Sequence, residues 1–299
     1  MEGDANAQTP SAVWHCFAIR PDAASPVAVE RDEVPELLAS GARLWVNVLE
    51  PSKDDARWLG DTFGFHELTL IDVMNNEVRP HEALYGDVLF TVLNAVNLNE
   101  GHEQLDTINL NIFLTKQFIV SAHSQPLKTT RGVIRTMEQP NDPLSRGTDY
   151  VYYRLLDGVI NRYLDIMDEV DEHLTRLETE IFETPSRRIQ EEIFREKRRL
   201  AYLKRCIGPK RDTIRDLVYS EFPQIRPEVR TLLRDVQEHI LRVADAIESY
   251  RELTSGLMDS YMSNISNRMN EVMKLMSIIA TVMLPLSFLT GLFGMNFDV

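Results

Sequence analysis

The sequence predicts an α+β protein with a membrane-spanning end: a mixed α/β domain at the N-terminus, a long helical hairpin, and a very long stalk helix that continues into a transmembrane helix. Three observations predict it. Short β-rich runs bounded by turn residues fill the N-terminal half, helical patterning is almost unbroken after residue 147, and residues 275–293 carry no charged side chain. That uncharged length is close to the roughly 20 residues that a helix needs to cross a bilayer. The expected parts are residues 1–145 (cytosolic α/β domain), 146–225 (hairpin), 226–274 (stalk) and 275–299 (membrane helix and loop).

The composition limits the partners of this protein. Its 299 residues carry a formal net charge of -14 at pH 7, which argues against nucleic acid as a partner and agrees with either simple solubility or attraction of cations. The N-terminus is polar and acidic, unlike a signal peptide. Cys16 and Cys206 fit neither a disulfide framework nor a zinc pattern. We therefore expect the bulk of the protein to lie in the reducing cytosol.

The N-terminal domain is expected to combine strands with short helices. Ser52 can cap a helix that ends at Phe63, because a serine hydroxyl accepts from the first free N–H groups and Gly64 permits a left-handed ending. The later strands, joined by polar turns, are expected to be antiparallel neighbours. Residues 139–147 are the clearest linker. The expected strands are residues 13–20, 27–30, 43–49, 87–98, 104–114 and 117–122, and the further helices are residues 66–75 and 126–138.

Two long helices are expected after the linker. Residues 148–183 are rich in acids in their second half, whereas residues 186–219 are rich in arginine and lysine and have an expected kink at Pro209. A basic run of this kind also occurs in proteins that bind nucleic acid or anionic lipid. The opposite charges favour instead an antiparallel hairpin whose two helices neutralise each other.

The last helix is expected to run from residue 227 to about residue 294, on the order of 100 Å at about 1.5 Å per residue. That length is typical of a stalk that enters a membrane rather than of a compact domain. One face of it, reached by alternating steps of three and four residues, is almost entirely small or polar, and we call these positions the seam. Such a seam indicates either a water-filled path or close helix packing with a solvated stalk. The seam consists of Gly294, Gly291, Ser287, Leu284, Ala280, Ser277, Met273, Asn270, Ser266, Ser263, Asp259, Gly256, Glu252, Ser249 and Asp245.

Residues 266–297, SNRMNEVMKLMSIIATVMLPLSFLTGLFGMNF, resemble the first transmembrane helix of CorA-type magnesium channels. The uncharged span ends in the Gly-Met-Asn signature of that family, here residues 294–296. The resemblance implies a homopentamer in the inner membrane, with a funnel built from the cytoplasmic parts and a pore lined by the first spans. The family's second span and basic tail do not follow here, so either a truncated chain or a one-span homologue is expected.

The resemblance implies pore roles for residues on or beside the seam. Mg²⁺ is small, hard and slow to lose water, so its pore is expected to present neutral oxygens to the hydrated ion. Asn296 matches the family's outer ring, Leu284 and Met273 would be apolar constrictions that gate by dewetting, and Asn270 matches a second polar ring. The expected pore residues are Asn296, Met295, Gly294, Gly291, Ser287, Leu284, Met276, Met273, Asn270 and Asp259.

The resemblance also implies a regulatory Mg²⁺ site between neighbouring subunits. The family's Leu-x-x-x-Asp segment matches Asp72 and its stalk Arg-Asp-Val matches Asp235, while Glu172, or Asp171 beside it, could add an outer contact. The acidic residue that often precedes the first ligand is Ile71 here. Carboxylates that repel each other when empty and are bridged when Mg²⁺ binds would favour the closed state.

Other functions are weighed against this one. An enzyme is not expected, since the sequence has no glycine-rich phosphate loop, GxSxG or HExxH motif. A ZntB-type zinc transporter would share the fold, but no histidine or cysteine follows His239, which favours Mg²⁺, with Co²⁺ and Ni²⁺ as larger passengers. Asp235 and His239 have a metal-binding spacing that also suits an exposed helix face. A single-span sensor or assembly subunit stays open, and no small-molecule substrate beyond divalent cations is expected.

Overall fold

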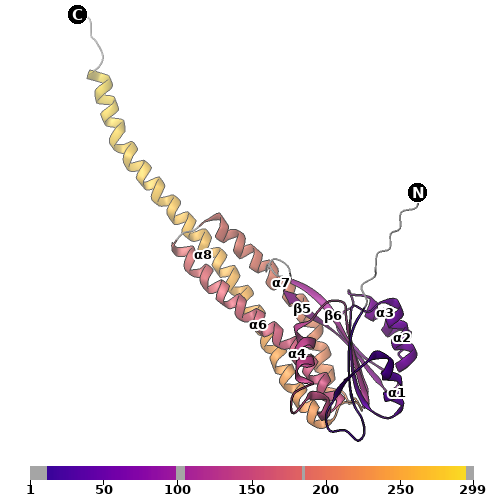
Figure 1. Cartoon of the computed structure of the whole chain (residues 1–299). Helices are drawn as coiled ribbons and strands as arrows, with labels where there is room; N and C mark the ends of the chain where they lie inside the picture. Colours follow the sequence, from indigo (N-terminus) through magenta and orange to yellow (C-terminus); the bar gives the residue numbers. More distant parts are fainter. Residues whose placement is uncertain (1–11, 99–104, 184–185, 294–299) are drawn as a thin grey trace, which may run out of the picture. The chain divides into compact units, whose positions relative to one another are not determined.

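The computed structural model describes residues 12–98, 105–183 and 186–293 of the chain. The chain divides into two compact units, Met1–Asp168 with Tyr202–Ile247 and Glu169–Ala201 with Glu248–Val299. The first unit contains the sheet and the short helices (Figure 1). Three long helices, each with residues in both units, complete the chain: α6 (Thr148–Glu183), α7 (Arg187–Tyr219) and α8 (Pro227–Phe293).

A seven-stranded mixed sheet forms the centre of the first unit. The strands β3 and β7 pair in parallel, and every other neighbouring pair among the described strands is antiparallel. The antiparallel order β7-β6-β5 confirms the expected neighbours. Across the sheet the strands are β2 (Val27–Val29), β1 (Val13–Ile19), β3 (Arg43–Leu49), β7 (Phe118–His123), β6 (Leu105–Leu114), β5 (Val88–Leu98) and β4 (His81–Tyr85).

Helices cover both faces of the sheet because successive side chains of a strand point to opposite faces and the central strands are apolar on both. Val46 of β3 joins the core beneath α1 (Val34–Ala39), α2 (Lys53–Phe63) and α3 (Glu67–Met74). Its neighbour Trp45 is fully buried on the other face. There Tyr152 of α6 shares a hydrogen bond of 2.8 Å with Thr91 of β5. Figure 1 shows α1, α2 and α3 on one side of the sheet and α6 on the other.

The helix α2 begins and ends as its sequence predicts. The Ser52 hydroxyl accepts from the backbone N–H of Asp55 at 3.2 Å, and the Asp55 carboxylate accepts from the Ser52 N–H at 2.9 Å. This reciprocal capping box satisfies two N–H groups that the helix leaves free. Gly64 ends the helix at φ 70°, a left-handed conformation that glycine adopts without strain.

The predicted strands and the predicted helices at residues 52–63, 66–75 and 126–138 are confirmed, the last as α4 (Lys128–Thr136). Besides one helix within residues 139–147, three short elements were missed by sequence reasoning: the 3₁₀ helix η1 (Arg31–Glu33), α1 and β4. Each is so short that a turn pattern masks its periodicity.

The expected linker at residues 139–147 is wrong, because part of it is folded into the domain. It contains the helix α5 (Pro143–Arg146), and Leu144 is fully buried. Asp142 caps this helix by accepting from the Ser145 N–H at 2.7 Å. The Arg43 guanidinium donates to the carbonyl oxygens of Leu144 and Ser145, 3.0 Å each. These tertiary contacts therefore fold a segment that its composition, rich in turn residues, predicted to be a linker.

The two helices of the hairpin neutralise each other only in part. Arg188 pairs with Glu180 at 2.8 Å and Arg199 with Glu169 at 3.4 Å, which links the base-rich helix to the acid-rich one as predicted. Other bases of α7 pair with acids of α7 itself, as Arg215 does with Asp216. The helix α7 continues through Pro209, the position of the expected kink.

Two basic side chains of the first unit, among the residues that the structure describes, are buried without an acidic partner. His123 is 2 % exposed and contacts the Gln125 carbonyl oxygen at 2.7 Å and Asn47 Oδ1 at 3.1 Å. Lys210 is fully buried, donates to the Cys206 carbonyl oxygen at 2.8 Å and lies 5.2 Å from the Tyr163 ring centroid. Burial lowers the pKa of His123 to about 4 and that of Lys210 to about 8.

We predict that acid destabilises the fold through His123. Because the folded-state pKa lies below the usual value of 6.5, the unfolded chain binds the proton more tightly, and stability falls as pH drops from about 6.5 towards about 4. The full effect is about 3 kcal/mol. In a thermal unfolding series over this range, His123→Asn should flatten the pH dependence. His66→Asn, at an exposed helix cap, should leave the dependence as in wild type, and equal curves for all three proteins would contradict the prediction.

Replacing Lys210 by an apolar residue should stabilise the protein. The charged amine is disfavoured at neutral pH, so Lys210→Met should raise the free energy of unfolding by about 2 kcal/mol at pH 7. The gain should shrink as pH rises from about 8 to 10.5, where the wild-type amine loses its proton on folding. Chemical denaturation at both ends of this range measures it, with the exposed Lys197→Met as control. A loss of stability in Lys210→Met would show that the single hydrogen bond and the ring contact outweigh the cost of burial.

Candidate functional site: the uncovered face of the long helix

The helix α8 has one buried face and an opposite, exposed face. In the first unit its buried stripe runs through Val229, Leu233, Val236, Ile240, Val243 and Ile247, and in the second unit it continues through Thr254, Leu257 and Tyr261. The seam residues from Asp245 to Ser266 are all exposed. All of them except Ser266 lie two residues away from a buried position, which is about 200° around an α-helix. The face that the sequence singles out is thus the one that a single chain leaves uncovered.

The apolar end of α8 is exposed on all sides. An 18-residue window within the helix has a mean hydropathy of 2.0, and none of it is buried within the chain. It is the one helix among the described residues that is long and apolar enough to cross a membrane. Leu284 is 71 % exposed and Phe288 66 %. Such a surface is unfavourable in water and requires lipid or other helices around it.

Hydroxyl groups within this apolar segment differ according to the face on which they lie. Thr281 and Thr290, which are off the seam, donate to the carbonyl oxygens of Ser277 and Leu286 one turn earlier, at 2.8 and 3.0 Å. The hydroxyl groups of Ser277 and Ser287, which are on the seam, have no hydrogen-bond partner among the described residues. A hydroxyl without a partner is costly in hydrocarbon. The threonines are therefore suited to lipid, whereas the two serines need water or another chain.

Most of the predicted pore residues lie along this face. Gly291, Ser287, Leu284, Met273 and Asn270 are exposed in α8, as are Met276 beside the seam and Asp259 in the stalk. Gly294, Met295 and Asn296 lie outside the described residues. Sequence reasoning named Ser277 as a seam residue but not as a pore residue. Its unpartnered hydroxyl group now adds it to the candidates.

Two hydrogen bonds join the C-terminal end of α6 to α8 just before the apolar segment of α8. Asn264 donates to the carbonyl oxygen of Ile181 at 2.6 Å, and Arg268 donates to that of Glu183 at 3.1 Å. These carbonyl groups are at the C-terminus of α6, where a helix leaves its last acceptors free. From Arg268 to the uncharged span is about 10 Å along the helix. The contact was missed from the sequence, in which Asn and Arg four residues apart give no specific signal.

Asp72 lies on α3 and has a partner that the sequence did not reveal. His81 of β4 places Nε2 3.7 Å from the Asp72 carboxylate, whose side chain is 28 % exposed. The other ring nitrogen of His81 contacts the Arg79 carbonyl oxygen at 3.0 Å. The strand β4 was not predicted, and the spacing of the two residues matches no metal motif, so sequence reasoning could not have paired them.

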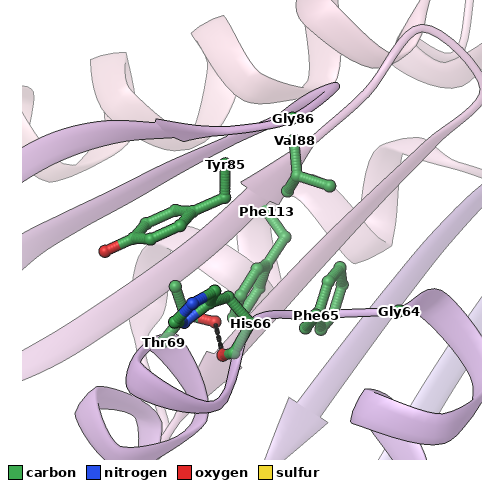
Figure 2. Close-up of a pocket in the computed structure, with 8 residues that line it drawn as sticks. All are labelled: Gly64, Phe65, His66, Thr69, Tyr85, Gly86, Val88 and Phe113. Atoms are coloured by element: carbon green, nitrogen blue, oxygen red, sulfur yellow. Dashed lines mark hydrogen bonds between the residues drawn. The ribbon is translucent and has the colours of Figure 1, made fainter.

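A pocket of about 230 Å³ opens beside the start of α3. Figure 2 shows that aromatic rings dominate it, with Phe65 near Phe113 and His66 near Tyr85. The ring centroids of the two pairs are 3.9 and 5.0 Å apart. No carboxylate lines this pocket, and Asp72 is not part of it. Among the described residues the pocket therefore lacks the carboxylate ligands that usually hold a hard cation.

Asp235 is exposed on α8. It lies one turn before His239, which contacts polar side chains of α6. His239, one turn later, contacts Asn161 Oδ1 at 3.1 Å and Asp157 Oδ1 at 3.8 Å. Burial raises the pKa of Asp157, the His239 ring opposes this, and the charge of Asp235 adds to the rise. Asp235 and His239 thus act in opposite directions on the pKa of the Asp157 carboxyl group.

The predicted regulatory residues are not brought together within one chain. Asp72 is on α3, which covers one face of the sheet, whereas Asp235 is on α8 beside α6, which covers the opposite face (Figure 1). Glu172 is exposed in the second unit. Within residues 12–98, 105–183 and 186–293, no three His, Cys, Asp or Glu side chains are gathered so as to hold a metal ion.

Comparison with known proteins gives a consistent result. Residues 40–299 match the family described as CorA-like Mg2+ transporter protein. The chain is 30% identical over 270 residues to the cobalt/magnesium transport protein CorA of Thermotoga maritima, an alignment that covers 87% of this chain and 74% of that protein. It is 26% identical over 274 residues to the zinc transport protein ZntB of Yersinia enterocolitica, covering 91% and 80%.

A solved structure, that of the full-length CmaX protein, superimposes with a TM-score of 0.81 at 25% sequence identity, covering 95% of this chain and 87% of that one. The fold predicted from the sequence is therefore confirmed, from the N-terminal sheet domain to the long helix with its apolar end. The matching proteins are named as transporters, as expected for a chain without an enzyme motif. Taken with the apolar, uncovered end of α8, these matches identify the chain as a membrane protein of the CorA-like Mg²⁺ transporter family.

Proposed function

We propose that the chain is one subunit of a channel that passes Mg²⁺ through the membrane passively, along a path lined by the seam of α8. The observation that carries the proposal is the division of α8 into a stripe buried in its own chain and an opposite polar seam, which from Asp245 to Gly291 is left exposed by the described residues. Several copies that turn their seams towards a common axis would enclose a polar path. By resemblance the number of copies is five.

The chemistry of the seam suits a hydrated divalent cation. Neutral oxygens can hydrogen-bond the waters of Mg²⁺ without holding the ion too tightly to release it. Ser277 and Ser287 supply hydroxyl groups with no partner among the described residues, and Asn270 supplies an amide at the start of the span. Leu284 and Met273 narrow the path, and Asn296 with Met295 and Gly294 would form its outer entrance.

The orientation follows from the charges at the two ends of the span. Arg268 and Lys274 precede the uncharged segment and Asp298 follows it. Because basic residues stay on the cytoplasmic side, the sheet domain would lie in the cytoplasm and the span in the inner membrane. The path would then open into the space between the stalks, where the Asp259 side chains would attract cations.

Regulation by cytoplasmic Mg²⁺ would require at least two copies of the chain. Asp72 is on α3, and Asp235 is on α8 beside α6, the helix that covers the opposite face of the sheet, so one ion would reach both only if they came from neighbouring subunits, with Glu172 as an outer contact. Such an ion would bind the closed assembly better than the open one, and this difference in affinity is what shifts the equilibrium.

Zinc transport is the alternative that a specific observation favours, namely the similarity to ZntB. The absence of histidine and cysteine after His239 in the sequence leaves the seam without imidazole or thiolate ligands, which suits Mg²⁺ better than Zn²⁺. Uptake of the two ions by the same vesicles separates the alternatives, and Co²⁺ and Ni²⁺ serve as larger test ions.

We predict that the two faces of the span respond differently to the same substitution. Ser287→Val, on the seam, should lower Mg²⁺ uptake into proteoliposomes by about tenfold or more, because an apolar ring raises the barrier for a hydrated ion. Thr290→Val, off the seam, should leave uptake near the wild-type rate. Equal losses in the two variants would rule out the seam as the path. No uptake by the wild-type chain would favour the single-span sensor or assembly subunit.

Mg²⁺ should stabilise the full chain through Asp72 and Asp235. A ligand that binds the folded assembly raises its stability, by about 1–3 kcal/mol at tenfold to hundredfold saturation. Thermal unfolding and oligomeric mass with and without millimolar Mg²⁺ measure the effect. The gain should vanish in Asp72→Asn and in Asp235→Asn and persist in Asp61→Asn, an exposed carboxylate on α2. A gain that survives in both test variants, or that only Zn²⁺ produces, would remove these residues from the regulatory site.

A further inference from the structure

A second pocket of the first unit has a charge opposite to that of the protein. Its volume is about 500 Å³, within the range of small-molecule sites. It lies where the end of β1, the start of β3 and the turn between β6 and β7 come together, with Ser145 of α5 at its side. Its charged lining residues are Arg20, Arg43 and Lys116, and no carboxylate from the described part of the chain lines it.

The three cations have no acidic partner. Among the residues that the structure describes, neither the Arg20 nor the Lys116 side chain makes a hydrogen bond or an ion pair, and both are exposed. Arg43 contacts carbonyl oxygens only. In a chain with a net charge of -14, unpaired like charges gathered in one hollow repel one another and gain stability from an anion.

The wall of this pocket is held in place. The Arg43 guanidinium is fixed by two hydrogen bonds of 3.0 Å to the carbonyl oxygens of Leu144 and Ser145, which leave its other N–H groups available. Gln117 donates to the carbonyl oxygen of Leu38 at 2.7 Å. A donor that is already oriented loses little conformational entropy when a ligand binds.

Two carboxylates belong to the same segments without entering the pocket. Asp22 lies in the loop after β1 but is not a lining residue. Asp142 is 4 % exposed and accepts from the backbone N–H and the hydroxyl group of Ser145, at 2.7 and 2.5 Å. Asp142 is thus occupied as the cap of α5, and the pocket itself keeps its positive charge.

We propose that this pocket binds the phosphate group of a small soluble phosphorylated compound. Arginine donates in a fork that matches phosphate oxygens, and lysine adds a mobile point charge. The lining of this pocket includes no seam residue and neither Asp72 nor Asp235, so the site is separate from them. Its ligand is an anion rather than a divalent cation. The proposal does not depend on the function proposed above.

The test uses the full chain in detergent micelles and a buffer that contains a chelator, so that no divalent metal bridges ligand and protein. The probes are inorganic phosphate and a nucleoside diphosphate, each compared with chloride at equal ionic strength because ionic strength alone weakens surface electrostatics. Thermal unfolding and titration calorimetry measure binding. The variants are Arg20→Ala with Lys116→Ala, and Arg131→Ala as a control that removes an exposed, unpaired arginine from the same unit.

Phosphate should raise the unfolding midpoint of the wild type and of Arg131→Ala. The double variant should bind it at least about tenfold more weakly, because each substitution removes a charge-assisted contact. Tighter binding of the nucleoside diphosphate would identify a nucleotide as the source of the phosphate, and equal binding would identify phosphate itself. A midpoint no higher in phosphate than in chloride, or equal binding by wild type and double variant, would overturn the proposal.

Discussion

The structure depends on one constraint: α8 must bury one stripe within its own chain while the opposite face stays uncovered. The buried stripe uses Val236, Ile240 and Val243 at the spacing of a helix that packs against neighbours. The seam, about 200° away, contains scarcely any side chain that gains from burial. Neither requirement alone would explain a helix of 67 residues, because a core helix ends with its domain and a membrane anchor needs no polar stripe. Together they allow one helix to belong both to a soluble domain and to a segment that can cross a membrane.

The length of each sequence signal decided how much of the molecule could be predicted from the sequence. Periodicity over many turns identified α6, α7 and α8, and the uncharged segment marked the span, because each signal is repeated along the chain. Signals of one turn or less failed. The strand β4 and the helix α1 were missed, and residues 139–147 were taken for a linker although Leu144 is fully buried. In that segment the local sequence favours turns. The backbone is held in place by a hydrogen bond from Arg43, which is distant in the sequence, to the Leu144 carbonyl oxygen.

The candidate site was predictable where it lies on a single helix and unpredictable where it joins elements. The seam can be drawn from the sequence because spacing along one helix fixes which residues share a face. The contact of His81 with Asp72 depends on the pairing of α3 with a strand that the sequence did not reveal. The contacts of Asn264 and Arg268 with α6 depend on how the hairpin is folded back. Asp72 is on α3 and Asp235 is on α8 beside α6, and no motif shows that α3 and α6 cover opposite faces of the sheet.

The parallel pairing of β3 and β7 has a consequence for how the chain is made. Trp45 and Ser121, which share a hydrogen bond across these strands, are 76 residues apart in the sequence. During synthesis, at roughly 5–20 residues per second, β3 has its partner β1 for several seconds before β7 leaves the ribosome. Its other edge meanwhile presents the apolar run Arg43–Leu49 with free N–H and C=O groups, a surface that invites pairing between chains. Completion of the sheet, a slow non-local step, therefore sets the period during which the nascent protein is most exposed to aggregation.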